Sequence, residues 1–271
     1  MKKIVSTVFL GLMILLLYLP ILILAVYSFT DSTNIGAIHH FSLQNYVTLF
    51  TKPELMEMIK GTLILAFGSA VIATILGTLG AVGVFYSGRF GNMVIGSLNQ
   101  VPIVNAEVVT AFSLCILLIG VFGVDKSNFI SLLIGHVVLE SPFVYMSVVP
   151  KLKQMDNSLY EAALDLGASP AVALRKIVFP QILPGVVSGF ALAITLSLDD
   201  YFITSYTKPA TFDTISTYVV NATRGAQTDI KTALWALSTI IFVVVVLAVV
   251  IMNVSGSKNE RKAGAGNEEK R

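Results

Sequence analysis

Long uncharged stretches alternate with short polar segments along almost the whole chain. A helix needs about 20 apolar residues to cross the hydrocarbon core of a bilayer, and six stretches reach this length. They run over Ile4–Phe29, Gly61–Phe85, Ile95–Phe122, Phe129–Val149, Pro184–Thr204 and Ala233–Val254. The pattern predicts an all-α, polytopic membrane protein whose six transmembrane helices form a single domain over residues 1–254. The remaining residues, 255–271, are polar and rich in glycine, which predicts a disordered tail.

The composition excludes several classes of protein. Only 13% of the 271 residues are charged, whereas a soluble domain carries about 25%, so a water-exposed surface could not be made from them. A net charge of +2 is too small to indicate nucleic-acid binding. Cys115 is alone and lies in an apolar run, which excludes a disulfide framework and a thiolate metal site.

The distribution of basic residues predicts the orientation in the membrane. Six spans place both termini on one side. With the termini in the cytoplasm, that side holds seven Lys and Arg residues outside the tail and five in the tail, against six on the opposite side. Cytoplasmic segments are enriched in Lys and Arg, so we expect both termini to face the cytoplasm.

Acidic residues interrupt three of the predicted spans: Glu107 the third, Glu140 the fourth, and Asp199 and Asp200 the fifth. A carboxylate at the middle of a bilayer costs about 2.5–3.5 kcal/mol on insertion scales, so these side chains should face a bundle interior or a watery path. Neighbouring residues of a helix point about 100° apart. One of Asp199 and Asp200 is therefore expected to line the path, while the other contacts a facing helix or a backbone donor.

Acids in a transport path favour a cationic substrate, because a carboxylate accepts charge-assisted hydrogen bonds from ammonium groups. Tyr201 and Tyr145 are candidates for cation–π contacts, each worth about 0.5–2 kcal/mol. The alternative is structural: the acids tie helices together by hydrogen bonds or stay protonated, and the tyrosines pack or anchor the protein at the membrane interface.

The loop before the fifth span has the pattern of a helix-turn-helix. Leu159, Ala162, Ala163 and Leu166 recur at helical spacing, and Gly167 follows where a helix end favours positive φ. Ser169 and Pro170 can begin a second helix, which is expected to end at Pro180. Such a hairpin either docks a partner or rests as an amphipathic segment on lipid headgroups.

The spacing in this loop resembles that of a known family. The loop reads Glu-Ala-Ala, three residues, Gly, nine residues, then Ile-Val-Phe-Pro. It is similar to the EAA loop of ABC-importer permeases, whose pattern ends in Ile-x-Leu-Pro, with Phe179 in place of the Leu. The resemblance implies a type I ABC importer permease fold and a coupling helix that sits in a cleft of a cytoplasmic ATPase subunit. It assigns to this coupling loop Glu161, Ala162, Ala163, Asp165, Gly167, Ile177 and Pro180.

Two further segments extend the resemblance over nearly all of the chain up to Val254. Residues 41–50 read Phe-Ser-Leu-Gln-Asn-Tyr-Val-Thr-Leu-Phe and look like the segment before the second span in these permeases. Residues 196–200, Leu-Ser-Leu-Asp-Asp, and 164–169, Leu-Asp-Leu-Gly-Ala-Ser, are similar to the PotC-type spermidine/putrescine permeases. The sequence departs from the family at Lys60-Gly61, where Asn usually opens the second span, and at Glu140, where a neutral residue is expected.

The resemblance implies a subunit in the inner membrane of a bacterial cell that forms the path for spermidine and putrescine by alternating access. Its expected partners are two cytoplasmic ABC ATPase subunits, a second, related permease as heterodimer partner, and an extracytoplasmic substrate-binding protein. The chain lacks a phosphate-binding G-x-x-x-x-G-K-[ST] motif, so we expect it to have no enzymatic activity and to bind no cofactor, with ATP and Mg used by the separate ATPase.

Three other functions remain open. Related permeases with the same loop import sulfate, molybdate, thiamine or iron, of which the buried acids disfavour the anions. An ion-coupled secondary transporter could use Glu107 and Asp200 as proton sites, but it lacks support from internal repeat symmetry. An intramembrane enzyme would need a nucleophile–base or metal constellation, which the three scattered histidines, His39, His40 and His136, do not provide.

Overall fold

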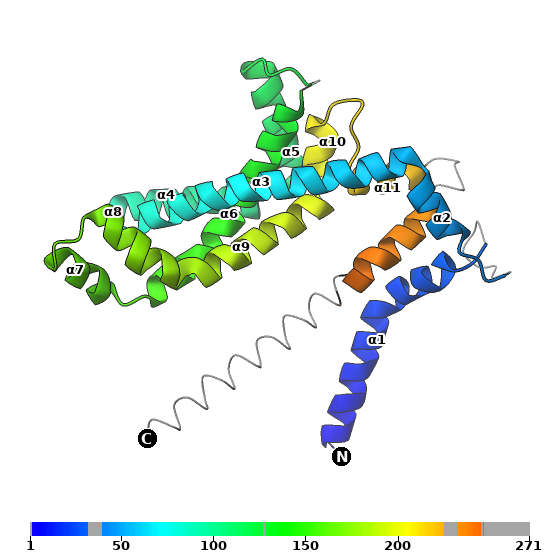
Figure 1. Cartoon of the computed structure of the whole chain (residues 1–271), viewed down its shortest axis with the longest axis horizontal. Coiled ribbons are helices and arrows are strands. Elements are labelled where there is room, and N and C mark those ends of the chain that lie inside the picture. The colour runs from blue at the N-terminus through cyan, green and yellow to red at the C-terminus, as the bar shows by residue number, and fades with distance from the viewer. Residues whose placement is uncertain (1, 32–39, 127, 225–231, 245, 247–271) are drawn as a thin grey trace. The chain divides into compact units, whose positions relative to one another are not determined.

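The computed structural model describes residues 2–31, 40–126, 128–224, 232–244 and 246, and the regular structure in these ranges is helical (Figure 1). The helices are α1 Lys2–Ser28, α2 Gln44–Thr51, α3 Pro53–Phe85, α4 Arg89–Val104, α5 Glu107–Cys115, α6 Phe129–Gln154, α7 Asn157–Asp165, α8 Pro170–Ala173, α9 Phe179–Asp199, α10 Phe202–Thr207 and α11 Ile215–Arg224, with π-helical turns η1 Ile116–Val121 and η2 Leu174–Val178. The chain divides into two compact units, residues 1–56 with 221–271, and residues 57–220. Each unit is described separately.

The prediction of six spans is confirmed in part. Within the described ranges, four helices are long and apolar enough to cross a membrane: Ser6–Ser28, Pro53–Phe85, Phe129–Gln154 and Pro170–Asp199. A fifth span is possible if Met93–Val104 and Glu107–Val121 count as one, although they meet at 105°. The sixth predicted segment begins as the apolar helix Thr232–Val244, and most of its remainder, like the predicted tail, lies outside the described residues.

In the first unit, the Phe-Ser-Leu-Gln-Asn-Tyr segment fastens α2 to the end of α1. The Asn45 side chain donates hydrogen bonds from Nδ2 to the carbonyl oxygens of Ser28 (3.1 Å) and Thr30 (3.0 Å). The Ser28 and Tyr46 hydroxyls share a further hydrogen bond of 2.9 Å. These contacts satisfy carbonyl groups that the end of a helix leaves without partners, and they explain the residue types in this motif.

Replacing Asn45 with alanine should destabilise this connection. The change leaves two carbonyl oxygens without their side-chain donor, and an unsatisfied buried polar group costs about 1–3 kcal/mol. We expect a lower midpoint of thermal denaturation for the purified Asn45→Ala protein. The control is Gln44→Ala, since the neighbouring Gln44 side chain is exposed; equal midpoints for the two variants would contradict the assignment.

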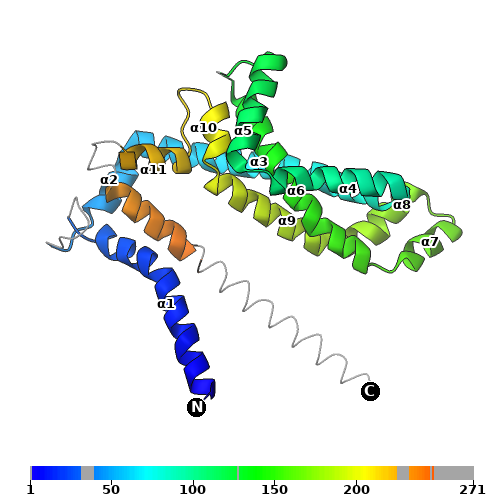
Figure 2. The same cartoon turned by 180° about the vertical axis from the view of Figure 1, so that it is seen from behind.

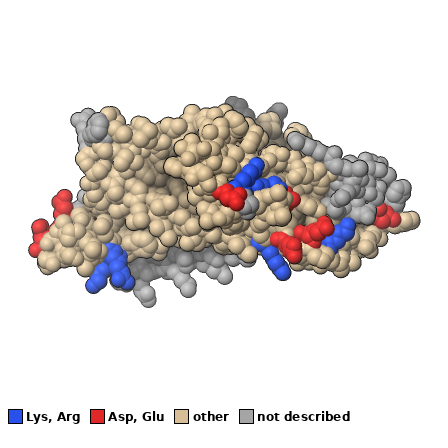
Figure 3. All heavy atoms as spheres, turned by 90° about the horizontal axis from the view of Figure 1, so that it is seen from above, with Lys and Arg blue, Asp and Glu red and all other residues tan. Residues whose placement is uncertain are grey.

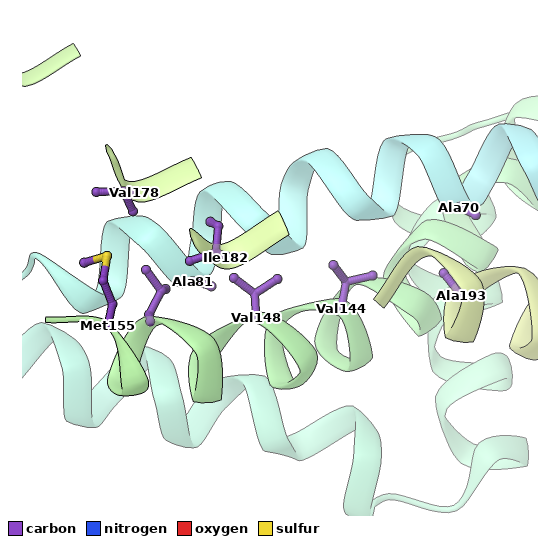
Figure 4. Packing of buried hydrophobic residues seen from close by; sticks show 9 residues of the cluster. Ala70, Ala81, Val144, Val148, Met155, Val178, Ile182 and Ala193 are labelled. Carbon is purple, nitrogen blue, oxygen red and sulfur yellow. The ribbon is translucent and has the colours of Figure 1, made fainter. Parts of the chain in front are cut away.

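In the second unit, α3, α6 and α9 pack along one another around a core of small and branched residues (Figure 4). Val144 and Val148 of α6 lie between alanines of α3 and residues of α9 such as Ile182. Gly77 of α3 is buried at the closest approach to α6: a Cβ there would lie 2.8 Å from both the Ser141 carbonyl oxygen and the Val144 Cβ. Small residues at such positions allow close packing of helices in lipid.

Replacing Gly77 with valine should therefore disrupt the α3–α6 contact. Overpacking of a core costs about 1–3 kcal/mol, and here the obstacle includes backbone, which cannot rotate away. We expect Gly77→Val to lower the yield of folded protein and its thermal midpoint in detergent. Gly83→Val is the matched control on the same helix, because a Cβ at Gly83 meets no atom within 4 Å. Similar losses in both variants would show that the low helix propensity of valine, and not the packing of α3 against α6, causes the loss of stability.

The loop between α6 and α9 contains the predicted hairpin, at the end of this unit far from α5 and α10 (Figures 1 and 2). Gly167 follows α7 with a φ of +87°, as predicted. The second helix does not end at Pro180. The chain is helical from Pro170 to Asp199, because the π-helical turn η2 shifts the hydrogen-bond register directly before the proline, where an N–H donor is missing.

Candidate functional site

The fifth predicted span is interrupted at its acidic pair, which corrects the prediction of a continuous helix to Thr204. Helix α9 ends at Asp199, and Asp200 is extended, with a ψ of 123°. Its carboxylate accepts hydrogen bonds from the backbone N–H of Ile203 (Oδ1, 3.2 Å) and of Thr204 (Oδ2, 2.7 Å). Asp200 thus caps the first turn of α10, which explains why the chain leaves α9 here.

The two acids of this pair have different environments. Asp200 is only 2% exposed and is the residue that binds backbone donors, whereas the Asp199 side chain is exposed. Tyr201 follows directly, is partly buried, and packs edge-on against the ring of Phe202. Of the two aspartates, Asp199 is therefore the one available to a solute.

Glu107 joins this pair from another part of the chain. It is the first residue of α5, just after the 105° bend, rather than near the middle of a straight span. Helix α10 packs against α5 and α6, as the two cartoon views show for α5 (Figures 1 and 2). The exposed Glu107 carboxyl lies close enough to Asp200 and Asp199 to interact with both electrostatically. We call Glu107, Asp199 and Asp200 the acid cluster.

Two members of the acid cluster, Glu107 and Asp199, have no ion-pair partner among the described residues, whereas Asp200 pairs with His136. The ion pairs there join Lys208 to Asp213, and His136 to Glu140 and Asp200. The structure shows no group of His, Cys, Asp and Glu side chains in the described ranges that is arranged to hold a metal ion. The cluster therefore presents two carboxyls without an ion-pair partner in the described part of the chain, a surface that attracts cations.

A buried polar network lies directly behind the acid cluster and involves α3, α6, α9 and α10. His136 is fully buried, with Nδ1 2.8 Å from the Ser197 hydroxyl and Nε2 2.9 Å from that of Thr204. Nδ1 also lies 3.8 Å from Glu140 Oε1, and Nε2 lies 3.6 Å from Asp200 Oδ2. From the sequence, His136 was one of three scattered histidines with no predicted role, although its spacing of four from Glu140 on a helix is the signal that could have indicated this network.

The other predicted path residues are not in the acid cluster. Glu140 is fully buried and accepts a hydrogen bond of 2.7 Å from the Ser69 hydroxyl, so it belongs to the network and not to an open path. Tyr145 lines a separate cavity of about 410 Å³ between α3, α4 and α6, together with Gln100 and Lys153. A contact of Tyr145 with a solute at the acid cluster is therefore not supported by its position.

Helix α7 presents the other candidate surface. Asp156 caps it by accepting a hydrogen bond from the Ser158 backbone N–H (3.0 Å), and bonds from Ser158 hold the pKa of Asp156 below its usual value. The ring of Tyr160 packs 4.9 Å from that of Tyr86, whose pKa is raised by burial and by Tyr160. Exposed residues of the motif on and after α7 include Glu161, Ala162 and Asp165.

Apolar side chains are exposed on the same hairpin. Leu166 is 89% exposed and Leu159 47% exposed. Gly167 is exposed as well, with no atom within 4 Å of an added Cβ. Ile177 and Pro180 lie farther along, within the turn η2 and at the start of α9. A short amphipathic helix with exposed leucines at the end of the unit is a surface that fits a partner groove.

Comparison with known proteins identifies the class. Residues 73–258 match the family described as binding-protein-dependent transport system inner membrane component. The chain belongs to this family. It is therefore a transport permease of the inner membrane, and not itself an enzyme. Uncharged atoms dominate the face seen in Figure 3, as expected of a protein surrounded by lipid.

Individual relatives of this permease narrow the class. It is 32% identical to the spermidine/putrescine transport system permease protein PotC of Haemophilus influenzae over 90% of this chain and 93% of that protein. It is also 32% identical to the putrescine transport system permease protein PotI of Escherichia coli, over 83% and 81%. In structure it resembles a bacterial ABC transporter for alginate import, with a TM-score of 0.73, 18% identity, and 93% and 95% of the two chains covered, which supports the predicted ABC permease fold.

Proposed function

We propose that this permease forms the path for polyamines, spermidine and putrescine, in an ATP-driven importer. The observation that carries the proposal is the acid cluster: carboxyls from α5 and from the α9–α10 junction lie together, and two of them, Glu107 and Asp199, have no ion-pair partner among the described residues. A polyamine carries ammonium groups along an aliphatic stem, and carboxylates bind these groups through charge-assisted hydrogen bonds, which are about twice as strong as those between neutral groups. The relatives named for polyamine transport support the same choice.

Within this path we assign the direct contacts to the exposed Glu107 and Asp199. Asp200, being buried, adds negative charge behind them and fixes the backbone at the start of α10. Tyr201, beside the cluster, is the aromatic residue placed for a cation–π contact. Alternating access then requires the α5 bend and the α9–α10 break to change their exposure between the two sides of the membrane.

The coupling function belongs to the α7 hairpin. In this proposal the exposed Glu161 and Leu166 of the hairpin dock in a cleft of a separate ATPase subunit, which uses ATP and Mg. The complete importer contains two ATPase subunits, a second, related permease and an extracytoplasmic binding protein. This permease has six spans and both termini in the cytoplasm. The exposed leucines on a short capped helix support the docking.

Uptake of labelled spermidine tests the substrate. Cells that lack this chain and any other polyamine importer are compared with and without its restoration, using unlabelled putrescine as competitor and sulfate as the anionic control. Restored uptake that putrescine inhibits and sulfate does not supports the proposal. Restored growth on another cation, such as thiamine or iron, without spermidine uptake would show that this cation is the substrate. The chain would then still be a permease of the same class.

A further inference from the structure

The buried network behind the acid cluster has a defined hydrogen-bond direction on one side of His136. Both carboxylate oxygens of Asp200 accept backbone N–H groups, and Oδ2 also lies 2.7 Å from the Thr204 hydroxyl. An ionised carboxylate, which has acceptors only, satisfies all three donors. With Asp200 ionised, the single hydrogen of the Thr204 hydroxyl is used in this bond, so the Thr204 oxygen accepts from His136 Nε2. Nε2 therefore carries a proton.

The other side of His136 permits two arrangements. The Ser197 hydroxyl lies 2.8 Å from Nδ1 and also contacts Glu140 and, at 3.4 Å, the Ser69 hydroxyl. If Nδ1 is protonated, it donates to Ser197, and Ser197 and Ser69 both donate toward an ionised Glu140. If Nδ1 is unprotonated, Ser197 donates to it and a protonated Glu140 donates to a serine oxygen.

In the second arrangement, every hydrogen-bond donor of the network has an acceptor. When Glu140 becomes a donor, the Ser69 hydroxyl can turn to the Ala66 carbonyl oxygen, which lies 3.3 Å away. The proton then sits on Glu140 Oε1, the oxygen that lies 2.7 Å from the Ser69 hydroxyl, while Oε2 has no hydrogen-bond partner among the described residues in either arrangement. Both arrangements use the same positions of the heavy atoms.

We propose that His136 and Glu140 exchange one proton in response to the cation held at the acid cluster, so that His136 is a positioning residue for transport. The Nδ1–H bond breaks, its electron pair stays on Nδ1, and Ser197 takes this proton while passing its own to the Glu140 carboxylate. The pair changes from imidazolium and carboxylate to imidazole and carboxylic acid. Its net charge stays constant, and no external base is needed.

The direction of the exchange follows from electrostatics. The imidazolium is stabilised by Asp200, 3.6 Å away, on one side and by Glu140 on the other. An ammonium group bound by Glu107 and Asp199 repels the imidazolium and competes for the field of Asp200, so it favours transfer of the proton to Glu140. By linkage, a neutral His136 in turn strengthens cation binding. This inference rests on the proposed function, since it needs a cation at the acid cluster.

The protonation of His136 can be observed directly because the chain has only three histidines. The His39→Gln, His40→Gln double variant leaves His136 as the sole histidine in the chain. This chain, labelled with ¹⁵N-histidine, is assembled with its unlabelled partner subunits in lipid bilayers for solid-state NMR, with and without millimolar spermidine. We expect two protonated ring nitrogens without spermidine, and loss of the proton from Nδ1 alone with it.

Three variants of the labelled chain complete the test. Glu140→Gln removes the proton acceptor and should abolish the response to spermidine. Glu107→Gln weakens the cation site and should shift the response to higher spermidine concentration. Ser131→Ala removes a buried hydroxyl on the same helix that has no hydrogen-bond partner in the described part of the chain, and it should leave the response unchanged.

The possible results separate this inference from the proposed function. A complex that imports spermidine while the Nδ1 signal stays the same rejects the proton exchange and leaves the polyamine path intact. A neutral ring whose proton sits on Nδ1 also rejects it, since Nε2 would then lack the assigned proton. A complex that neither imports nor binds spermidine rejects both.

Discussion

Replacing Glu107 with glutamine should lower spermidine uptake by about 10- to 100-fold while leaving the amount of protein in the membrane unchanged. Hydrogen bonds to charged groups contribute about 1.5–3 kcal/mol, and each 1.4 kcal/mol is tenfold in affinity. Glu107 is exposed at the start of α5 and caps no helix with its side chain, so the fold does not depend on its charge. The measurement is initial uptake of labelled spermidine, normalised to the permease in isolated membranes.

The matched control for this experiment is Asp200→Asn. Asp200 accepts hydrogen bonds from Ile203, Thr204 and the Thr204 hydroxyl, and an amide NH₂ cannot accept at the Oδ2 position. We expect this variant to lose both uptake and membrane abundance. Full uptake by Glu107→Gln at normal abundance would remove Glu107 from the path and with it the main support for a cation site.

Replacing Gly167 with proline should abolish ATP-driven uptake. The residue has a φ of +87°, which proline cannot adopt, and its N–H donates to the Leu164 carbonyl oxygen at 2.9 Å. A misplaced proline costs about 3 kcal/mol or more, enough to displace the end of α7 and to reduce its docking more than a hundredfold. The readout is spermidine-dependent uptake together with ATP hydrolysis stimulated by the loaded binding protein.

Gly167→Asn provides the control at the same position. Asparagine tolerates a left-handed conformation, so this variant should keep most of the activity. The membrane-embedded helices lie outside the hairpin, and both variants should therefore reach the membrane in equal amounts. If the proline variant still couples ATP hydrolysis to transport, α7 is not the element that contacts the ATPase.

The long apolar runs predicted the membrane helices well because lipid leaves the backbone few alternatives to a helix. The apolar pattern did not, however, predict the points where the helices break. The residues that follow Asp200 are apolar through Ile203. An aspartate inside a helix and an aspartate that caps the next helix cannot be distinguished there from the sequence, because the N–H groups that it binds are not known. Pro102 inside α4 and Asn105 at its end were the local signals of the 105° bend.

The hairpin could be predicted almost completely, since its Gly167 and its Ser-Pro step act through local backbone chemistry. The end of its second helix could not, because a π-helical turn depends on the packing of residues such as Val178 and Ile182 against α3 and α6. The sequence predicted Glu107, Asp199 and Asp200 as candidate path residues, but it did not predict that the three lie together. Its members come from helices whose meeting point is a tertiary property.

The double duty of Asp200 also limits how this transporter could change its selectivity. In the proposed path, Asp200 both caps the start of α10 and adds negative charge near the substrate, so it cannot be replaced without a new cap for this helix. Glu107 and Asp199 have no such structural role. Laboratory evolution toward a different cargo should accordingly accumulate its first substitutions at these two positions, and leave Asp200 untouched until a new cap has arisen nearby.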